Sequence, residues 1–182
     1  MNNSPIKIET ERLILREILP LDENGLFELD SDPDVHRYLG QTPVKDTEQI
    51  KAVIQFIRQQ YIDHGIGRWA VIEKETNEFV GWSGFKYMTE KTNNHNNYYD
   101  LGYRFIKKHW GKGYATETAK ASLEYGFTTL NLNEIFATVD IENVASKNVL
   151  EKAGLTVIES FLEDGIPHHW LKITREEWLQ QQ

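Results

Sequence analysis

The sequence reads Lys108-His109-Trp110-Gly111-Lys112-Gly113-Tyr114-Ala115-Thr116-Glu117 between a predicted strand at residues 99–106 and a predicted helix at residues 114–128. Two glycines one residue apart let the backbone turn tightly and approach a ligand without a Cβ clash. The helix that follows presents unpaired N–H groups and the positive end of its dipole, which suit a pyrophosphate. An ordinary strand-to-helix turn fits the two glycines equally well, so the turn alone leaves both interpretations open.

Basic residues gather around this turn in a chain whose formal charge is −8. They are Arg104, Lys107, Lys108 and Lys112. The cluster fits an anionic ligand better than the net charge does. The acidic total argues against non-specific binding of nucleic acid and tolerates a cationic substrate.

Two familiar nucleotide-binding motifs do not match the turn. A Walker loop requires Gly-x-x-x-x-Gly-Lys-Ser/Thr, which the sequence lacks. A dinucleotide fingerprint requires a third Gly or Ala three residues after Gly113, where Thr116 stands, and its strand–helix unit comes early in a chain rather than late.

Hydrophobic periodicity and turn residues predict the elements around the turn. Strands are expected at residues 12–18, 68–73, 79–88, 99–106, 135–141, 156–162 and 168–173. Helices are expected at residues 21–30, 33–39, 46–61, 114–128 and 145–153, with a short final helix after Thr174. Asp46 and Gln49 resemble a capping box for the third helix. Polar residues predict turns at 74–78 and 163–167 and a loop at 89–97.

The order of these elements indicates a mixed α/β sheet. The strand at 99–106, the helix at 114–128 and the strand at 135–141 form a right-handed parallel crossover. The other strands follow one another as hairpins and are expected to be antiparallel. We find no repeat and no interdomain linker, so the 182 residues predict a single domain spanning 1–182.

Composition excludes several classes. With 40% apolar residues the chain can form a core, and without cysteine it can form neither disulfides nor thiolate metal sites. No stretch reaches the roughly 20 apolar residues that span a membrane. The first residues lack a basic segment followed by an apolar run, so a signal peptide is not expected and a cytoplasmic location is.

Four segments, in this order along residues 9–155, resemble the GNAT family of N-acetyltransferases. They are Glu9-Thr10-Glu11-Arg12-Leu13-Ile14-Leu15-Arg16; Asp100-Leu101-Gly102-Tyr103; the turn from Trp110 to Glu117; and Asn143-Val144-Ala145-Ser146 followed by Glu151-Lys152-Ala153-Gly154-Leu155. They look most like the ribosomal-protein acetyltransferase (RimJ/RimL-like) branch. The family's acetyl-CoA loop reads Gln/Arg-x-x-Gly-x-Gly/Ala, and Lys108 departs from it at the first position. That matters little if backbone N–H groups hold the ligand.

This resemblance implies a GNAT-like fold, with a mostly antiparallel central sheet, flanking helices and one parallel strand pair that splays apart around the pantetheine of acetyl-CoA. It implies transfer of acetyl from acetyl-CoA to a primary amine, either a protein N-terminus or a small molecule, by a monomer or homodimer without a metal. The implied acetyl-CoA contacts are Phe105, Ile106, Lys108, Trp110, Gly111, Lys112, Gly113, Tyr114, Ala115, Thr116, Asn143 and Ser146. A non-catalytic acyl-CoA-binding module is the alternative, because binding and chemistry are separable.

The resemblance also suggests catalytic residues. Ser146 is the candidate for protonating the leaving thiolate, although a serine in the first turn of a helix can equally bond to backbone. Backbone N–H groups between Tyr103 and Ile106 are the expected oxyanion donors. Asp100 and Tyr103 are candidates for the base. Glu163, Asp164 and a water chain remain alternatives to them, and an exposed carboxylate is more often only a surface group.

The histidines and tryptophans are better explained by structural roles than by metal or base binding. His168 and His169 are adjacent on a predicted strand and therefore point to opposite faces, which makes them poor joint metal ligands. The five tryptophans are expected to line the core and the cleft rather than to stack on bases.

Overall fold

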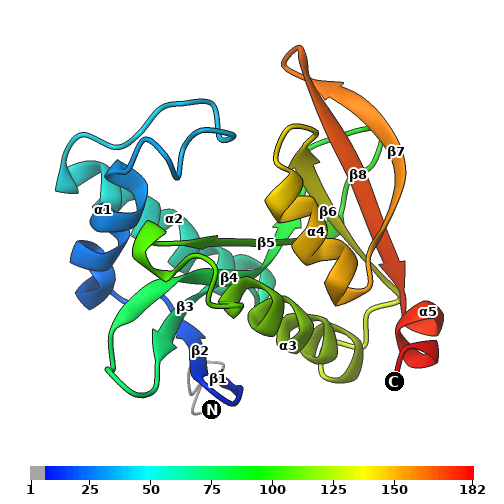
Figure 1. Ribbon diagram of the computed structural model, residues 1–182, viewed down its shortest axis with the longest axis horizontal. Helices are drawn as coiled ribbons and strands as arrows, with labels where there is room; N and C mark the ends of the chain where they lie inside the picture. The colour runs from blue at the N-terminus through cyan, green and yellow to red at the C-terminus, as the bar shows by residue number, and fades with distance from the viewer. Residues whose placement is uncertain (1–6) are drawn as a thin grey trace.

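The computed structural model describes residues 7–182, and within them a single sheet of eight strands carries helices on both faces (Figure 1). The strands are β1 (Lys7–Glu9), β2 (Leu13–Glu17), β3 (Arg68–Glu73), β4 (Phe79–Met88), β5 (Tyr98–Phe105), β6 (Glu134–Asp140), β7 (Thr156–Glu163) and β8 (Ile166–Thr174). Their spatial order is β1-β2-β3-β4-β5-β6-β8-β7. Among the strands of residues 7–182, only β5 and β6 pair in parallel, so the predicted mixed sheet is confirmed.

The helices divide between the two faces of the sheet. They are α1 (Glu23–Ser31), α2 (Thr47–His64), α3 (Tyr114–Thr128), α4 (Val144–Ala153) and α5 (Arg175–Gln180), with short 3₁₀ turns η1 (Pro20–Asp22) and η2 (Lys107–His109). Of the two larger core clusters, one joins α1 and α2 to the sheet and the other joins α3 and α4 to its opposite face. A third, small cluster consists of Tyr98, Phe136 and Trp170. No helix found in residues 7–182 is both long and apolar enough to cross a bilayer.

Alternation along the strands explains the two cores, because successive side chains point to opposite faces. Val71 of β3 belongs to the cluster under α3, whereas its neighbours Ala70 and Ile72 belong to the cluster under α2. The predicted apolar stripe of α3 is confirmed, since Ala119, Leu123 and Phe127 are buried there. The central strands are therefore apolar on both faces.

The start of α2 carries a variant of the predicted capping box. The Asp46 side chain accepts a hydrogen bond from the Gln49 N–H at 3.0 Å, as expected. The Gln49 side chain, however, accepts from the N–H of Lys45 at 2.7 Å rather than from that of Asp46. Both contacts fix the direction in which the chain enters the helix.

The predicted helix at residues 33–39 is wrong, and the segment forms turns instead. Asp32 is extended with ψ 117°, as expected for a residue before proline, and this ends α1. The hydrogen bonds that follow differ in spacing: the His36 N–H donates to Asp32 O, four residues back, and the Arg37 N–H donates to Asp34 O, three residues back. Gly40 and Gln41 then have φ of 78° and 52°, which no helix continues through.

The turn predicted at residues 163–167 is shorter than expected. Asp164 and Gly165 alone turn the chain, with φ of 50° and 81°, as in a tight two-residue hairpin. Pro167 already belongs to β8, opposite Leu162. At the other end of the sheet, β1 pairs with β2 as a hairpin that periodicity did not predict, because β1 is only three residues long.

The parallel strands β5 and β6 are in register at a single pair, Asp100 opposite Phe136. On its other side β5 pairs with β4 along its whole length, and β6 pairs with β8 along its whole length. The edge of β5 from Leu101 to Phe105 therefore faces a gap. This is the separation that the resemblance implied.

We expect Leu123→Ala to lower the free energy of unfolding by about 2–5 kcal/mol, because Leu123 is 1% exposed and its removal leaves a cavity between α3 and the sheet. Urea denaturation measures the change. The control is Leu179→Ala in α5, where the side chain is 58% exposed and a change within about 0.5 kcal/mol is expected. Equal losses in the two variants would contradict this assignment of the core.

Candidate functional site

The turn before α3 exposes backbone donors. Gly111 and Gly113 have φ of 76° and 83°, a region that favours glycine. Gly113 is the N-cap of α3 and no side chain caps the helix, whereas Asp46, Asn143 and Thr174 cap α2, α4 and α5. The first helical hydrogen bond runs from the Glu117 N–H to Gly113 O at 3.1 Å. The N–H groups of Tyr114, Ala115 and Thr116 precede it and are available to a ligand.

Space around the turn also fits a bound anion. A Cβ built on Gly111 would meet no atom within 4 Å. A Cβ on Gly113 would meet only the guanidinium of Arg12, at 3.4 Å. The backbone of the turn is therefore open on the side where a diphosphate would approach, and the residues present fit that group.

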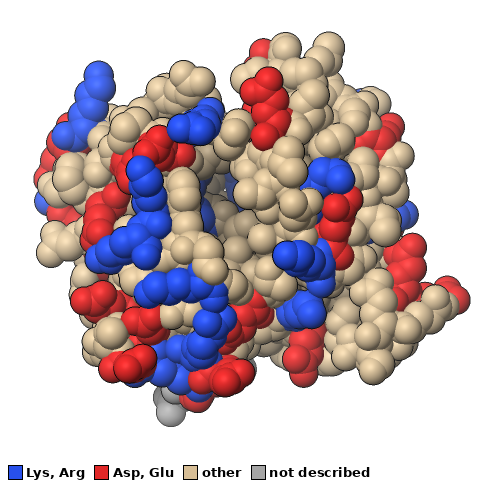
Figure 2. All heavy atoms as spheres, viewed as in Figure 1, with Lys and Arg blue, Asp and Glu red and all other residues tan. Residues whose placement is uncertain are grey.

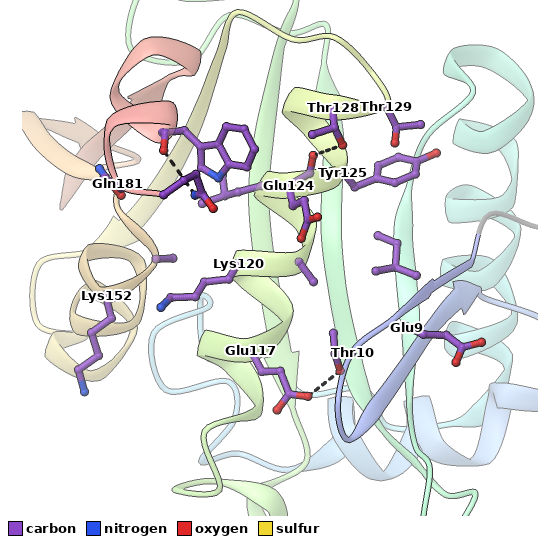
Figure 3. Close-up of a pocket in the computed structure, with 16 residues that line it drawn as sticks. Glu9, Thr10, Glu117, Lys120, Glu124, Tyr125, Thr128, Thr129, Lys152 and Gln181 are labelled. Carbon is purple, nitrogen blue, oxygen red and sulfur yellow. Dashed lines mark hydrogen bonds between the residues drawn. The ribbon is translucent and has the colours of Figure 1, made fainter.

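The first turn of α3 is fastened to the connection between β1 and β2. Glu117 accepts a hydrogen bond from the Thr10 hydroxyl at 2.6 Å (Figure 3), and a second from the Arg12 N–H at 3.1 Å. The Arg12 guanidinium pairs with the same carboxylate at 2.7 Å and donates to Lys112 O at 2.8 Å. Burial raises the pKa of Glu117, but these hydrogen bonds outweigh that effect and hold the pKa below its ordinary value.

Tyr114 anchors the turn to the sheet. Its side chain is buried, and its hydroxyl donates to the carboxylate of Glu73 at the end of β3. The Arg12 guanidinium lies over its ring, 4.6 Å from the centroid. Tyr114 can therefore offer a ligand only its backbone, because the side chain is already committed to the protein interior.

The predicted basic cluster is paired with acids. Arg104 bonds to Asp30 of α1 at 2.6 Å, Lys108 lies 3.1 Å from Glu28 of the same helix, and Lys107 pairs with Asp34 just beyond it. Lys112 lies 3.8 Å from Glu73. Figure 2 shows Lys and Arg interleaved with Asp and Glu over this face. These pairs fasten α1 and the turns after it to the end of β5.

The end of β5 presents backbone groups to the gap. The Ile106 N–H bonds to Val80 O of β4 at 3.0 Å, so by strand alternation the N–H groups of Phe105 and Tyr103 face the other way, toward β6. The Trp110 indole donates to Phe105 O at 2.7 Å, and the residue stays 49% exposed. The turn is thus joined directly to the strand edge at the gap.

Ser146 and Tyr103, both predicted catalytic residues, meet across the gap. The Tyr103 hydroxyl lies 3.1 Å from Ser146 Oγ and donates to Ser146 O at 2.9 Å. Asn143 accepts from the Ser146 N–H at 3.1 Å and caps α4. Burial raises the pKa of Tyr103, so the phenol is protonated at neutral pH. It can donate a proton or a hydrogen bond, and it is poorly suited to be a base.

Asp100, the third predicted catalytic residue, points to the opposite face of β5. Its carboxylate bonds to Arg68 of β3 at 2.6 Å, and Arg68 also donates to Asp100 O at 2.7 Å. Burial raises the pKa of Asp100, and the Arg68 guanidinium opposes that shift. A Cβ on Gly102 would meet the guanidinium at 2.8 Å, so glycine makes room for this pair.

The remaining candidates lie elsewhere. Glu163 and Asp164 are exposed at the tip of the β7–β8 hairpin. His168 and His169 bond to Ile166 O and to Ser160, respectively. No group of three or more His, Asp or Glu side chains suited to a metal ion occurs in the part of the chain that the structure describes.

Two depressions mark the surface. Figure 2 shows a hollow between the α1 side and the α4 side of the molecule, toward which the gap between β5 and β6 opens (Figure 1). A separate groove of about 790 Å³ follows α3 between β1 and α5 (Figure 3). Ser146 and Tyr103, the candidate catalytic residues, do not line the second groove.

Known proteins resemble this chain over most of its length. The family model described as "Acetyltransferase (GNAT) domain" matches residues 12–156. The chain belongs to the GNAT acetyltransferase family. A relative named "Uncharacterized N-acetyltransferase p20", from Bacillus licheniformis, is 37% identical over 86% of this chain and 83% of its own.

Solved structures agree with the GNAT assignment. A GNAT acetyltransferase from Bacillus anthracis is 29% identical, covers 94% of this chain and 99% of its own, and superimposes with a TM-score of 0.78. The spermidine N-acetyltransferase from Vibrio cholerae, solved with CoA and spermine, has a TM-score of 0.75 at 18% identity, over 93% of this chain and 99% of its own. At that identity the second likeness concerns the GNAT fold alone.

The sequence predicted the glycine turn before α3 but not the contacts that hold it in place. Thr10 and Arg12 lie in a segment that was matched to the family without a role, and their partner Glu117 lies about a hundred residues later. Glu73 and Arg68 gave no signal, because a charged residue at the end of a strand usually faces solvent. Only the order of the strands in the sheet could have predicted that such charged residues pair with residues on other elements.

The depressed pKa of Glu117 predicts a pH-dependent stability. The contribution of the ionised carboxylate is present above the ordinary pKa of 4.5 and is lost as pH falls through the lower pKa of the folded state. We expect the difference in free energy of unfolding between the native chain and Glu117→Gln to narrow below about pH 4.5. Urea denaturation at several pH values measures it. Glu48→Gln, at a 77% exposed side chain, is the control, and a difference independent of pH would contradict the prediction.

Proposed function

We propose that this GNAT protein is an acetyl-CoA-dependent N-acetyltransferase acting on a primary amine. The observation that carries the proposal is the position of the N-terminus of α3, which no side chain caps. It adjoins the open edge of β5, the strand whose Tyr103 contacts Ser146. A diphosphate at the turn and a thioester in the gap would then belong to one extended ligand.

Backbone groups are the main binding elements in this proposal. The N–H groups from Gly111 to Thr116 would hold the diphosphate, with the helix dipole favouring its charge. Lys108, Trp110 and Lys112 would border it, while Phe105, Ile106 and Asn143 would border the pantetheine. Release of Lys108 from Glu28 would add a charge-assisted contact, because both side chains are about half exposed.

The reaction is a direct attack of the neutral amine nitrogen on the thioester carbonyl carbon. Negative charge develops on the carbonyl oxygen and needs a fixed donor. The N–H of Tyr103 or Phe105 meets that need, because each points into the gap, whereas the Ile106 N–H is already bonded to Val80. Collapse of the tetrahedral intermediate forms the amide and expels the thiolate of coenzyme A.

Ser146 and Tyr103 would act on the leaving thiolate as a pair. When the Tyr103 hydroxyl donates to Ser146 O, the Ser146 hydroxyl remains free to donate to sulfur. The raised pKa of Tyr103 keeps that phenol protonated and the pair neutral. The amine proton must leave by another route, since neither hydroxyl is a base at neutral pH.

Asp100, the other predicted base, also has little support. A raised pKa suits a base, but the carboxylate is bonded to Arg68 and lies on the face away from Ser146. A water chain through the hollow to bulk solvent is an alternative route for the proton. The contacts of Asp100 favour a structural pair over a free carboxylate.

The acceptor class stays broad. A protein N-terminus, as in the RimJ/RimL-like branch, and a small amine both fit an open hollow. We further propose that residues 1–182 form one acetyltransferase domain that works in the cytoplasm. A non-catalytic acyl-CoA-binding module is the second candidate, and it would bind acetyl-CoA without releasing free thiol when amines are supplied.

Acetyl-CoA at about 100 times its dissociation constant should stabilise the fold by ~2.7 kcal/mol, which raises the melting temperature by about 5–10 °C. Gly111→Val should abolish the shift, because valine strains a φ of 76° and fills the open side of the turn. Thermal denaturation with and without ligand measures both effects.

The control for Gly111→Val is Gly65→Val, at the end of α2, where φ is 71° and a Cβ also meets no atom within 4 Å. It imposes similar strain far from the turn and should keep the shift. No shift for the native chain at millimolar acetyl-CoA would count against the proposal.

Ser146→Ala and Tyr103→Phe should each slow turnover, on the order of 10²-fold if the pair stabilises the leaving thiolate by a hydrogen bond, and leave the acetyl-CoA shift intact. Detection of free thiol with a panel of amines and peptides measures turnover. Because the two act as a unit, the double variant should lose far less than the product of the single losses. Ser160→Ala in β7 is the control. Loss of the thermal shift along with turnover would make Ser146 a structural residue.

A further inference from the structure

Arg12, in the connection between β1 and β2, contacts the turn that precedes α3. We propose that Arg12 is a positioning residue for coenzyme A, which holds the turn open and cancels the charge of Glu117 without touching the ligand. The proposal rests on the binding of acetyl-CoA at this turn.

The contacts of Arg12 reach three parts of the turn at once. One guanidinium nitrogen donates to Lys112 O at 2.8 Å, between the two glycines. Another lies 3.4 Å from the Cβ position of Gly113, and the group as a whole lies over the Tyr114 ring. The carbonyl of Lys112 is therefore drawn toward Arg12, and the glycine backbone keeps its left-handed path.

Glu117 creates an electrostatic problem that Arg12 removes. A carboxylate in the first turn stabilises a helix by interacting with the positive end of its dipole. The same carboxylate repels a diphosphate that binds at that end. Arg12 pairs with it at 2.7 Å, and Thr10 donates a hydrogen bond to it (Figure 3). The first turn of α3 is thus neutral, and the N–H groups keep their attraction for an anion.

These two effects predict in which direction the affinity for coenzyme A changes when Glu117 is removed in addition to Arg12, and simple packing predicts a different direction. Removal of Arg12 leaves an uncompensated carboxylate next to the ligand, so removal of Glu117 as well should restore part of the affinity. If Arg12 only held β2 against α3, a second loss at Glu117 would weaken binding further or change nothing.

The experiment measures the dissociation constant of coenzyme A by titration calorimetry at fixed ionic strength, for the native chain, Arg12→Ala and the double variant Arg12→Ala/Glu117→Gln. We expect Arg12→Ala to weaken binding about tenfold, which corresponds to about 1.4 kcal/mol. The double variant should recover at least about threefold of that loss, in the range of a charge at a helix terminus. In Arg12→Ala, turnover with S-acetylpantetheine, which lacks the diphosphate, should fall less relative to the native chain than turnover with acetyl-CoA does.

The matched control is the pair Lys51 and Glu48 in the first turns of α2, an exposed ion pair far from the turn. Lys51→Ala and Lys51→Ala/Glu48→Gln should both bind coenzyme A within about twofold of the native chain. If Arg12→Ala does not fold, Arg12→Gln carries the same comparison, because glutamine keeps most of the side-chain length and removes the charge.

Two results would overturn the proposal: binding by Arg12→Ala within about twofold of the native chain, or a double variant that binds no more tightly than Arg12→Ala. Failure of the native chain to bind coenzyme A at millimolar concentration is a different outcome, because it rejects the proposed function itself.

Discussion

The single register pair between β5 and β6 is the constraint on which the rest of the structure depends. Beyond Asp100 and Phe136 the two strands share no ladder, although β4 and β8 hold their outer edges firmly. From Leu101 to Phe105 the β5 backbone has no register partner in β6, and on this edge the Trp110 indole donates to Phe105 O. The proposed thioester site lies at this open strand edge.

Elements far apart in the sequence stabilise the two sides of this opening. Ion pairs from α1 and the turns after it fix the end of β5, while Thr10 and Arg12 of the N-terminal hairpin region fix the first turn of α3. Several of these pairs are exposed and individually weak. Their joint effect is to hold a glycine-rich turn in one conformation before any ligand arrives, which lowers the entropic cost of binding.

Polar pairs in the interior divide by face. Tyr103 and Ser146 lie on the α4 side of the sheet, and Asp100 with Arg68 lies on the α2 side. Strand alternation dictates this division, because residues 100 and 103 of β5 are an odd number apart. Resemblance had grouped all three as catalytic. The geometry brings two of them together and gives the third a partner of its own.

Local signals in the sequence determined the helices with clear apolar stripes, the strands, the crossover and the glycine turn. They failed for residues 33–39, where hydrogen bonds of three-, four- and five-residue spacing are mixed, and for the three-residue strand β1. Ser146 and the turn could be proposed as site candidates from motifs, because a motif is local in the sequence. The tertiary structure alone decided the gap beside β5, the pairing of Asp100 with Arg68 and the link from Arg12 to Glu117. Each depends on which strands become neighbours and on which face a side chain then points, and no local propensity encodes a contact between residues separated by tens of positions.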